Sequence, residues 1–202
     1  PCYVIDEKLL ISNLKILDRV QKKTGCKILL AQKSFSMYSL YPFIAKYLQG
    51  TTASGLFEAK LGYEEMGKPF GKETHIFSPA FIDDDFDDIM TYCDHIVFNS
   101  FAQWNKFKNR VLNFDKKINC GIRINPEYSE IETDIYNPCF SGSRLGVKAS
   151  DFDESSLDGI SGLHVHTICE QNADTLSRTI KVVDEKCGKY LKNMKWINFG
   201  GC

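Results

Sequence analysis

The chain has 202 residues, of which 43% are hydrophobic and 25% are charged, so it is long and apolar enough to bury one large core. Its 25 basic and 26 acidic residues nearly cancel, which predicts no binding to nucleic acid or to an anionic membrane surface. The 8 cysteines are scattered without a Cys-x-x-Cys pair, which argues against a zinc ribbon or a disulfide scaffold and favours a reducing cytoplasm.

The first element along the chain is predicted to be a helix. Asp6 is suited to cap its start and Gly25 to end it, and apolar residues recur between them at helical spacing. Seven short apolar runs follow and are predicted as strands, with amphipathic, helix-like stretches between them. These runs are 27–33, 51–54, 74–80, 95–100, 118–126, 159–168 and 195–201.

Alternating strands and helices predict an α/β fold with a parallel sheet and helical crossovers. No Gly-x-Gly-x-x-Gly follows the first strand, so we favour a TIM-like (β/α)8 barrel over an open doubly wound sheet. A full barrel takes roughly 250 residues and eight strand–helix units. We therefore expect residues 1–202 to form one incomplete barrel domain, truncated after its seventh strand, and the long irregular stretch 125–157 to be functional or disordered.

The candidate site residues stand at the ends of the predicted strands. Lys33 closes the first strand and His166 comes near the end of the sixth, so both side chains are expected in the bowl where barrel strands end. Gly200 and Gly201 follow the seventh strand and would offer bare backbone N–H groups to a phosphate. A lysine, an aromatic ring and a phosphate cradle are typical of a pyridoxal-phosphate site. The alternative for Lys33 is a strand-capping lysine in water.

A metal site is the main competing interpretation. His164 and His166 share one face of a strand and Cys169 follows, which is a partial zinc set without further ligands on other strands. An ordinary core histidine is also open at these positions. Arg123 is a charge inside an apolar strand, where it could bridge barrel layers or orient a ligand.

Taken together, these segments resemble the carboxynorspermidine decarboxylase family, which consists of fold-type III pyridoxal-phosphate enzymes of the alanine racemase and ornithine decarboxylase superfamily. The resemblance covers essentially the whole chain. Its most specific parts are the run His-Val-His-Thr-Ile-Cys-Glu-Gln at 164–171 and the Asn-Pro-Cys run at 137–139. Other matching segments are 3–6, 30–33, 52–54, 78–80, 97–100, 123–126, 143–146 and 196–201.

The resemblance implies a role for each candidate residue. Lys33 would hold the cofactor as an imine, His166 would stack on its ring, and Arg123 would lie near the ring. Ser54 is implied as a further cofactor-binding residue, and Gly200 with Gly201 would meet the phosphate. The family usually has a third glycine where this chain has Cys202, whose side chain could crowd the phosphate-binding turn. Also implied are a β-rich second domain, absent from this chain, and a homodimer with shared active sites.

The function implied by the resemblance is decarboxylation of carboxynorspermidine, and of carboxyspermidine, to norspermidine and spermidine. Two alternatives stay open at this stage. One is a pyridoxal-phosphate decarboxylase of ornithine, lysine or diaminopimelate, and the other is a non-catalytic homologue that binds the cofactor. No metal is expected in any of these hypotheses.

Overall fold

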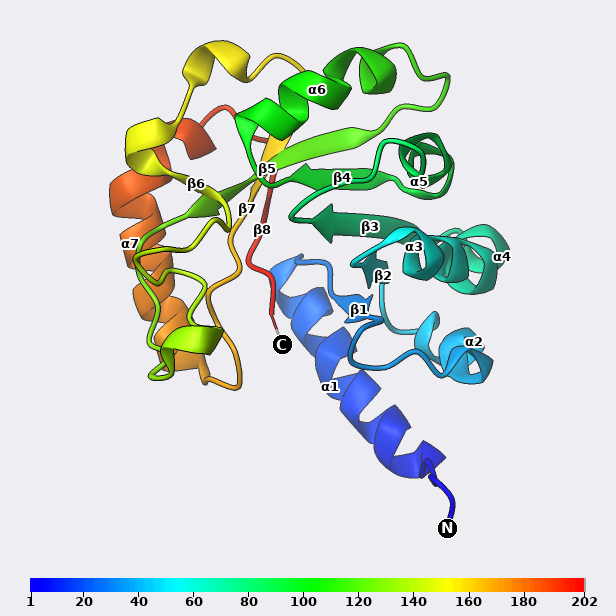
Figure 1. Ribbon diagram of the computed structural model, residues 1–202. Helices are drawn as coiled ribbons and strands as arrows, with labels where there is room; N and C mark the ends of the chain where they lie inside the picture. The colour runs from blue at the N-terminus through cyan, green and yellow to red at the C-terminus, as the bar shows by residue number, and fades with distance from the viewer. Residues whose placement is uncertain (202) are drawn as a thin grey trace. The chain divides into compact units, whose positions relative to one another are not determined.

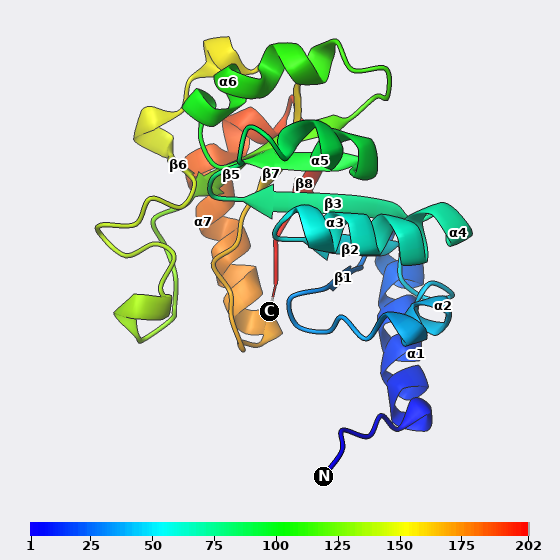
Figure 2. The same ribbon diagram turned by 45° about the vertical axis from the view of Figure 1, so that its right-hand side comes forward.

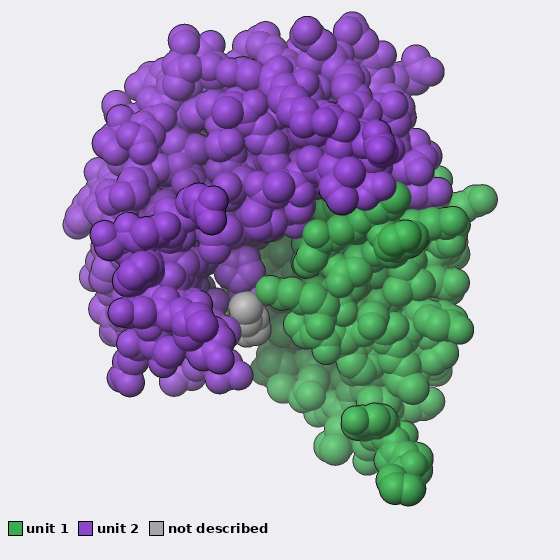
Figure 3. Space-filling model, in the orientation of Figure 1, with its two compact units in different colours: residues 1–76 green, residues 77–202 purple. Residues whose placement is uncertain are grey.

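The computed structural model describes residues 1–201, and the chain divides into two compact units, residues 1–76 and the residues from 77 onward (Figure 3). Each unit contains parallel strands connected by helices (Figure 1). The division falls within one strand, so the chain passes from one unit to the next along a continuous element. That residues 1–202 form a single domain stays a prediction.

Helix α1, Glu7–Thr24, opens the first unit as the sequence predicts. The Asp6 carboxylate accepts from the N–H groups of Lys8 at 2.8 Å and Leu9 at 3.2 Å, which satisfies two amides that the helix itself leaves without partners. Gly25 ends the helix at φ 75°, a left-handed conformation that favours glycine. Local sequence alone therefore determines both ends of α1.

Three strands make up the sheet of the first unit, with parallel pairing in the order β1, β2, β3. Their bounds are Leu29–Ala31 for β1, Gly50–Ala53 for β2 and Glu73–Ser78 for β3. The connections contain a 3-10 turn at Tyr38–Leu40, α2 at Tyr41–Ile44, α3 at Leu56–Gly62, a π-helical turn at Tyr63–Gly67 and α4 at Lys68–Phe70.

The core of the first unit forms where α1 meets the short helices. Leu14 of α1 is buried against a cluster that comprises Leu40, Tyr41, Ile44, Ala45, Leu48 and Met66. Gln21, two helical turns after Leu14, is also buried. Its side-chain amide donates to the carbonyl of Tyr47 at 2.7 Å and accepts from the Ile28 N–H at 2.8 Å. Both polar atoms of Gln21 are thereby satisfied, so its burial carries little penalty.

The second unit has four parallel strands in the order β4, β5, β7, β8, and a short strand β6 pairs with the end of β5. Figures 1 and 2 show α7 beside the strands of this unit. The strands are β4 His95–Phe98, β5 Asn119–Asn125, β6 Val147–Lys148, β7 Ile160–His164 and β8 Trp196–Asn198. The helices are α5 Phe86–Tyr92, α6 Phe101–Leu112 and α7 Ala173–Leu191.

An aromatic cluster fills the space between α5, α6 and β4. Phe86 and Phe107 stack with ring centroids 4.0 Å apart, and Phe98 of β4 lies 5.1 Å from the ring of Trp104. Phe81 packs edge-on against this group. Such rings contribute most of the apolar area that a small core can bury.

All seven predicted strands are present in residues 1–201. Six of them are shorter than their apolar runs, and β2 has the predicted length but begins one residue earlier. The largest difference concerns the run 159–168, because β7 ends at His164. Strand β6 was not predicted; it lies inside the stretch 125–157, whose other regular elements are short 3-10 turns. None of the described helices is long and apolar enough to cross a membrane.

Candidate active site

Lys33 lies in the turn that follows β1, and its side chain is exposed. The turn is held by its buried neighbour Gln32, whose amide donates to the carbonyl of Glu58 at 2.8 Å and accepts from the Tyr41 hydroxyl at 3.1 Å. Lys33 therefore lies in a turn held by Gln32, two residues beyond the end of β1, whereas the sequence predicted it as the last residue of that strand.

Ser54 follows the neighbouring strand β2 at the equivalent position. Ala31 pairs with Thr52, and continuing this register by two residues aligns Lys33 with Ser54. The Ser54 N–H donates to a carboxylate oxygen of Glu58 at 2.6 Å, which links this strand end to the first turn of α3. The first unit thus presents a lysine and a serine at adjacent strand ends.

Arg123 of β5 is only 5% exposed and has no carboxylate partner among residues 1–201. Its guanidinium lies over the ring of Phe77, 4.7 Å from the centroid, and one of its terminal nitrogens donates to the backbone carbonyl of His166 at 3.1 Å. Burial lowers the pKa of Arg123 to about 10, so the group remains a cation at neutral pH. Arg123 therefore holds the His166 segment and keeps further donors for a ligand.

His166 and Gly200 lie side by side beyond the ends of β7 and β8. His164 pairs with Asn198, and both residues lie two positions further along their strands. Gly200 has φ 61°, and a Cβ added there would come within 2.7 Å of Cγ of the His166 ring, so this close approach requires glycine. The Gly200 N–H donates to the Asn198 side chain at 2.7 Å. At Gly201, with φ 134°, an added Cβ would meet no heavy atom within 4 Å. Cys202, whose side chain was expected to crowd the phosphate-binding turn, lies outside the described residues.

His164 and His166 do not form a metal set with Cys169 in the described part of the chain. His164 is buried and stacks on Phe77 with centroids 5.5 Å apart, while the two histidine rings meet edge to face at 5.7 Å. Cys169 is exposed. Phe77, from β3, was not predicted as a site residue, and its only sequence signal was a place in an apolar strand.

The long stretch 125–157 is held to the strand ends by side-chain amides. Asn125 of β5 donates to the carbonyl of Pro138 at 3.5 Å. Asn99, which follows β4, donates to the carbonyl of Arg144 at 2.8 Å and accepts from the Gly146 N–H at 2.9 Å. These bonds tie the stretch to the carboxyl ends of β4 and β5.

Two non-glycine residues beside this site have left-handed backbone angles. Glu127 follows β5 at φ 51°, and Glu170 follows β7 at φ 53°. Such conformations cost free energy and persist where the surrounding contacts enforce them, as functional sites often do. Both residues lie in the segments that carry or contact His166.

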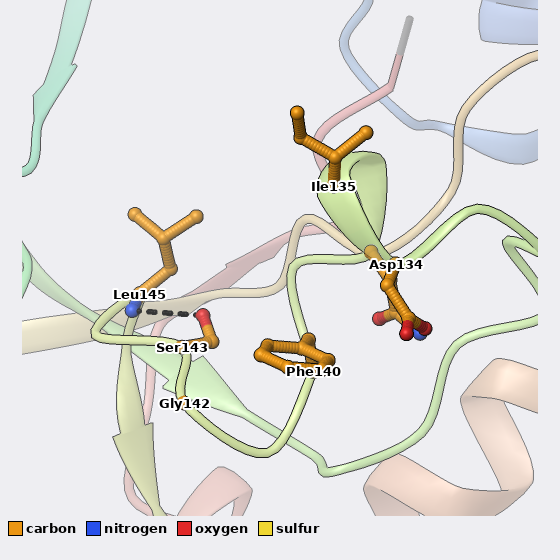
Figure 4. A pocket seen from close by; sticks show the side chains of 7 residues that line it. Asp134, Ile135, Phe140, Gly142, Ser143 and Leu145 are labelled. Atoms are coloured by element: carbon orange, nitrogen blue, oxygen red, sulfur yellow. Dashed lines mark hydrogen bonds between the residues drawn. The ribbon is translucent and has the colours of Figure 1, made fainter.

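A pocket of about 420 Å³ opens within the same stretch (Figure 4). It combines one carboxylate, that of Asp134, with the apolar side chains of Ile135, Phe140 and Leu145. Ser143 accepts the Leu145 N–H at 3.2 Å and fixes one wall of the pocket. Asp134 has no ion-pair partner among residues 1–201. Sequence reasoning missed Asp134 because it is one of several acids in an irregular segment.

The residues of the second unit fit the pyridoxal phosphate that the sequence predicts. Arg123 offers cationic donors beside His166, and the ring of His166 is fixed against glycine backbone. Beyond them, Gly201 leaves open space where a larger residue would place a side chain. This combination of a cation, an aromatic ring and uncovered backbone is suited to an anionic, aromatic ligand.

No protein-family model matches the chain. A carboxynorspermidine/carboxyspermidine decarboxylase from Campylobacter jejuni is 43% identical over 201 residues, covering 100% of this chain and 50% of that protein. A carboxyaminopropylagmatine decarboxylase from Synechocystis sp. is 40% identical over 201 residues, again covering 100% of this chain and 50% of its relative.

Solved structures give the same match. The crystal structure of carboxynorspermidine decarboxylase from Campylobacter jejuni, complexed with norspermidine, has a TM-score of 0.87 at 40% identity and covers 100% of this chain and 50% of its own. Diaminopimelate decarboxylase from Helicobacter pylori, complexed with L-lysine, has a TM-score of 0.68 at 14% identity, covering 94% of this chain and 52% of its own. The second likeness shows the fold alone.

The fold is therefore that of the fold-type III decarboxylases, and the predicted TIM-like barrel of the alanine racemase type, truncated after seven strands, is confirmed. Within this class, the chain is a homologue of the carboxynorspermidine decarboxylases. It spans about half the length of the relatives that it matches.

Proposed function

We propose that the full protein containing this chain decarboxylates carboxynorspermidine, and also carboxyspermidine, with pyridoxal phosphate as cofactor. The observation that carries the proposal is the group formed by Arg123, His166 and Gly200 at the carboxyl ends of parallel strands. That group lies in a chain whose relatives include a carboxynorspermidine/carboxyspermidine decarboxylase and a structure with bound norspermidine.

We assign each candidate residue a separate contact with the cofactor. Lys33 would attach it covalently, with Ser54 at the adjacent strand end as a further contact. In the second unit His166 would lie against its ring, Arg123 would supply positive charge, and the backbone at Gly200 and Gly201 would approach its phosphate. When bound, pyridoxal phosphate supplies an electron sink for the bond that breaks as carbon dioxide leaves.

We assign the amine chain of the substrate to the Asp134 pocket. A long polyamine is a flexible cation, and it requires carboxylates with apolar surface between them. Asp134 offers a carboxylate without an ion-pair partner among residues 1–201, and Ile135 and Phe140 offer the apolar surface.

Asp134→Asn is therefore expected to raise KM for carboxynorspermidine about tenfold while leaving kcat within about twofold, because a contact to the distant amine is lost and the reacting carbon is untouched. Steady-state kinetics on the full natural protein measure both constants. A lower kcat with an unchanged KM would remove Asp134 from substrate binding.

A second substrate is favoured by one specific observation. The carboxyaminopropylagmatine decarboxylase is nearly as similar to this chain as the carboxynorspermidine/carboxyspermidine decarboxylase. Release of carbon dioxide from carboxynorspermidine, carboxyspermidine, carboxyaminopropylagmatine and diaminopimelate, compared side by side, would decide between these substrates. A protein that binds cofactor and releases none from any of them would be a non-catalytic homologue.

The cofactor assignment is tested at Lys33. Borohydride reduction of the loaded full protein should fix pyridoxal phosphate to the peptide containing Lys33, and Lys33→Ala should abolish both labelling and turnover. Lys27→Ala, at the other end of the same apolar run, is the matched control and should leave labelling intact. Labelling of another lysine, or near-normal turnover by the Lys33→Ala protein, would refute the assignment.

A further inference from the structure

Glu130 is the most highly connected side chain in the segment that follows β5. Its two carboxylate oxygens accept from Nε and a terminal nitrogen of Arg178 at 2.6 and 2.7 Å, a forked arrangement. The hydroxyl of Thr175 donates to the same carboxylate at 2.9 Å, and the Tyr128 hydroxyl donates to it as well. Asp174 accepts a further bond from Arg178 at 2.8 Å.

This network joins two segments that are remote in the sequence. Glu130 belongs to the stretch after β5, whereas Thr175 and Arg178 belong to the first two turns of α7. Between β7 and α7 runs the connection 165–172, which contains His166. One end of the connection is fixed by the sheet, and the Glu130 network fixes the helix at its other end.

The stretch after β5 also contacts the connection directly. Ser129, next to Glu130, donates from its hydroxyl to the carbonyl of Thr167 at 3.0 Å. One residue earlier, the carbonyl of His166 accepts from Arg123 at 3.1 Å. Two successive carbonyls around His166 are therefore held by residues of β5 and the segment after it. Displacing Glu130 would move Ser129 and α7 together.

The Glu130–Arg178 ion pair contributes too little to folding stability to account for the number of hydrogen bonds around it. Side chains of Glu130 and Arg178 are 26% and 47% exposed, and ion pairs open to solvent contribute little to folding stability. Hydrogen bonds from Arg178 and Tyr128 lower the pKa of Glu130 to about 2, so the carboxylate is charged throughout the neutral range. The carboxylate is thus charged near neutral pH and its hydrogen bonds are geometrically specific, although the network adds little stability.

We propose that Glu130 is a positioning residue, which fixes the connection between β7 and α7 through Arg178 and Thr175 and thereby sets the place of His166 beside Arg123. The proposal deepens the proposed function, since His166 is the residue assigned to the cofactor ring. The placement of His166 itself does not depend on which cofactor binds.

The test uses Glu130→Gln in the full natural protein. Glutamine keeps the size of the side chain and removes the charge that the forked pair with Arg178 needs. The control is Glu154→Gln, which removes an exposed carboxylate that pairs with Lys189 near the other end of α7 at 3.3 Å. Neither substitution is expected to shift the thermal midpoint by more than a degree or two, because both pairs are exposed.

The first measurement is the NMR signal of His166 in protein labelled at histidine and free of cofactor. The chain has only 4 histidines, so assignment by substitution is practical. We expect Glu130→Gln to shift or broaden the His166 signal and Glu154→Gln to leave it unchanged. Arg178→Gln should reproduce the change, and the double variant should add nothing to it.

The second measurement is cofactor affinity, which is expected to fall about tenfold in Glu130→Gln. An unchanged His166 signal in Glu130→Gln, or an equal change in Glu154→Gln, would overturn the positioning role. The two proposals fail separately. A protein that never takes up pyridoxal phosphate refutes the proposed function, while the His166 signal still decides the role of Glu130.

Discussion

At the scale of single residues, the second unit keeps a buried cation next to a histidine. Arg123 has lost most of its hydration, which lowers its pKa to about 10, and it gains the face of Phe77 and one backbone carbonyl in exchange. These contacts use one N–H group of the guanidinium and leave its other N–H groups as donors for a ligand. A lysine at this position would lose both the stacking and the fork, so the two basic residues are not equivalent here.

The prediction at this scale concerns His166, which we expect to contact a cofactor ring and not a metal. His166→Ala should weaken pyridoxal-phosphate binding about tenfold, because one stacking face is lost. Metal analysis of the purified full protein should find no stoichiometric zinc, and chelators should leave activity unchanged. Stoichiometric zinc that disappears in His166→Ala would contradict this assignment and restore the metal interpretation.

At the scale of elements, two glycines determine how β5, β7 and β8 fit together. The indole of Trp196 in β8 lies across Gly121 of β5 and Gly162 of β7, and its N–H donates to the Ser161 hydroxyl at 3.1 Å. A Cβ at Gly162 would come within 2.0 Å of the indole, and one at Gly121 within 2.3 Å. The strands therefore depend on the absence of side chains at these two positions.

Gly162→Ala is predicted to destabilise the protein by about 1–3 kcal/mol, because the indole must move from its place. Gly142→Ala is the control, since an added Cβ there would only touch the Phe140 ring at 3.4 Å. Urea denaturation of both variants measures the free energies of unfolding. Adding Trp196→Phe to Gly162→Ala should recover part of the loss, and strict additivity of the two substitutions would contradict the packing described here.

At the scale of the whole molecule, each unit has a strand with one open edge. Among residues 1–201, β1 pairs only with β2, and β8 pairs only with β7. Unpaired strand edges present backbone donors and acceptors that recruit other chains. The relatives are about twice as long as this chain, so their further residues are available to cover such edges.

Residues 1–202 expressed alone are therefore predicted to self-associate or to be only marginally folded. Sedimentation velocity over a concentration series should show growing species for residues 1–202 and one discrete species for the full protein. A soluble monomer of residues 1–202 with a cooperative unfolding transition would show that the open edges do not govern its behaviour.

Much of the local structure could be predicted from the sequence. The caps of α1 at Asp6 and Gly25 are local signals, and each of the seven strands coincides with an apolar run. The same runs predicted Lys33 and His166 near the carboxyl ends of strands, and each lies two residues beyond the end of β1 or β7. These features depend on residues close together in the chain, and local spacing is what a sequence displays directly.

Tertiary structure alone decided the contacts between segments far apart in the chain. Only folding brought Phe77 under Arg123, Gly200 against His166, and Arg178 onto Glu130. It also ended β7 at His164, before its apolar run was complete, and paired β6 with β5 inside a stretch that the sequence predicted to be irregular. Hydrogen-bond ladders and side-chain packing depend on which segments become neighbours, and a single sequence does not display that information.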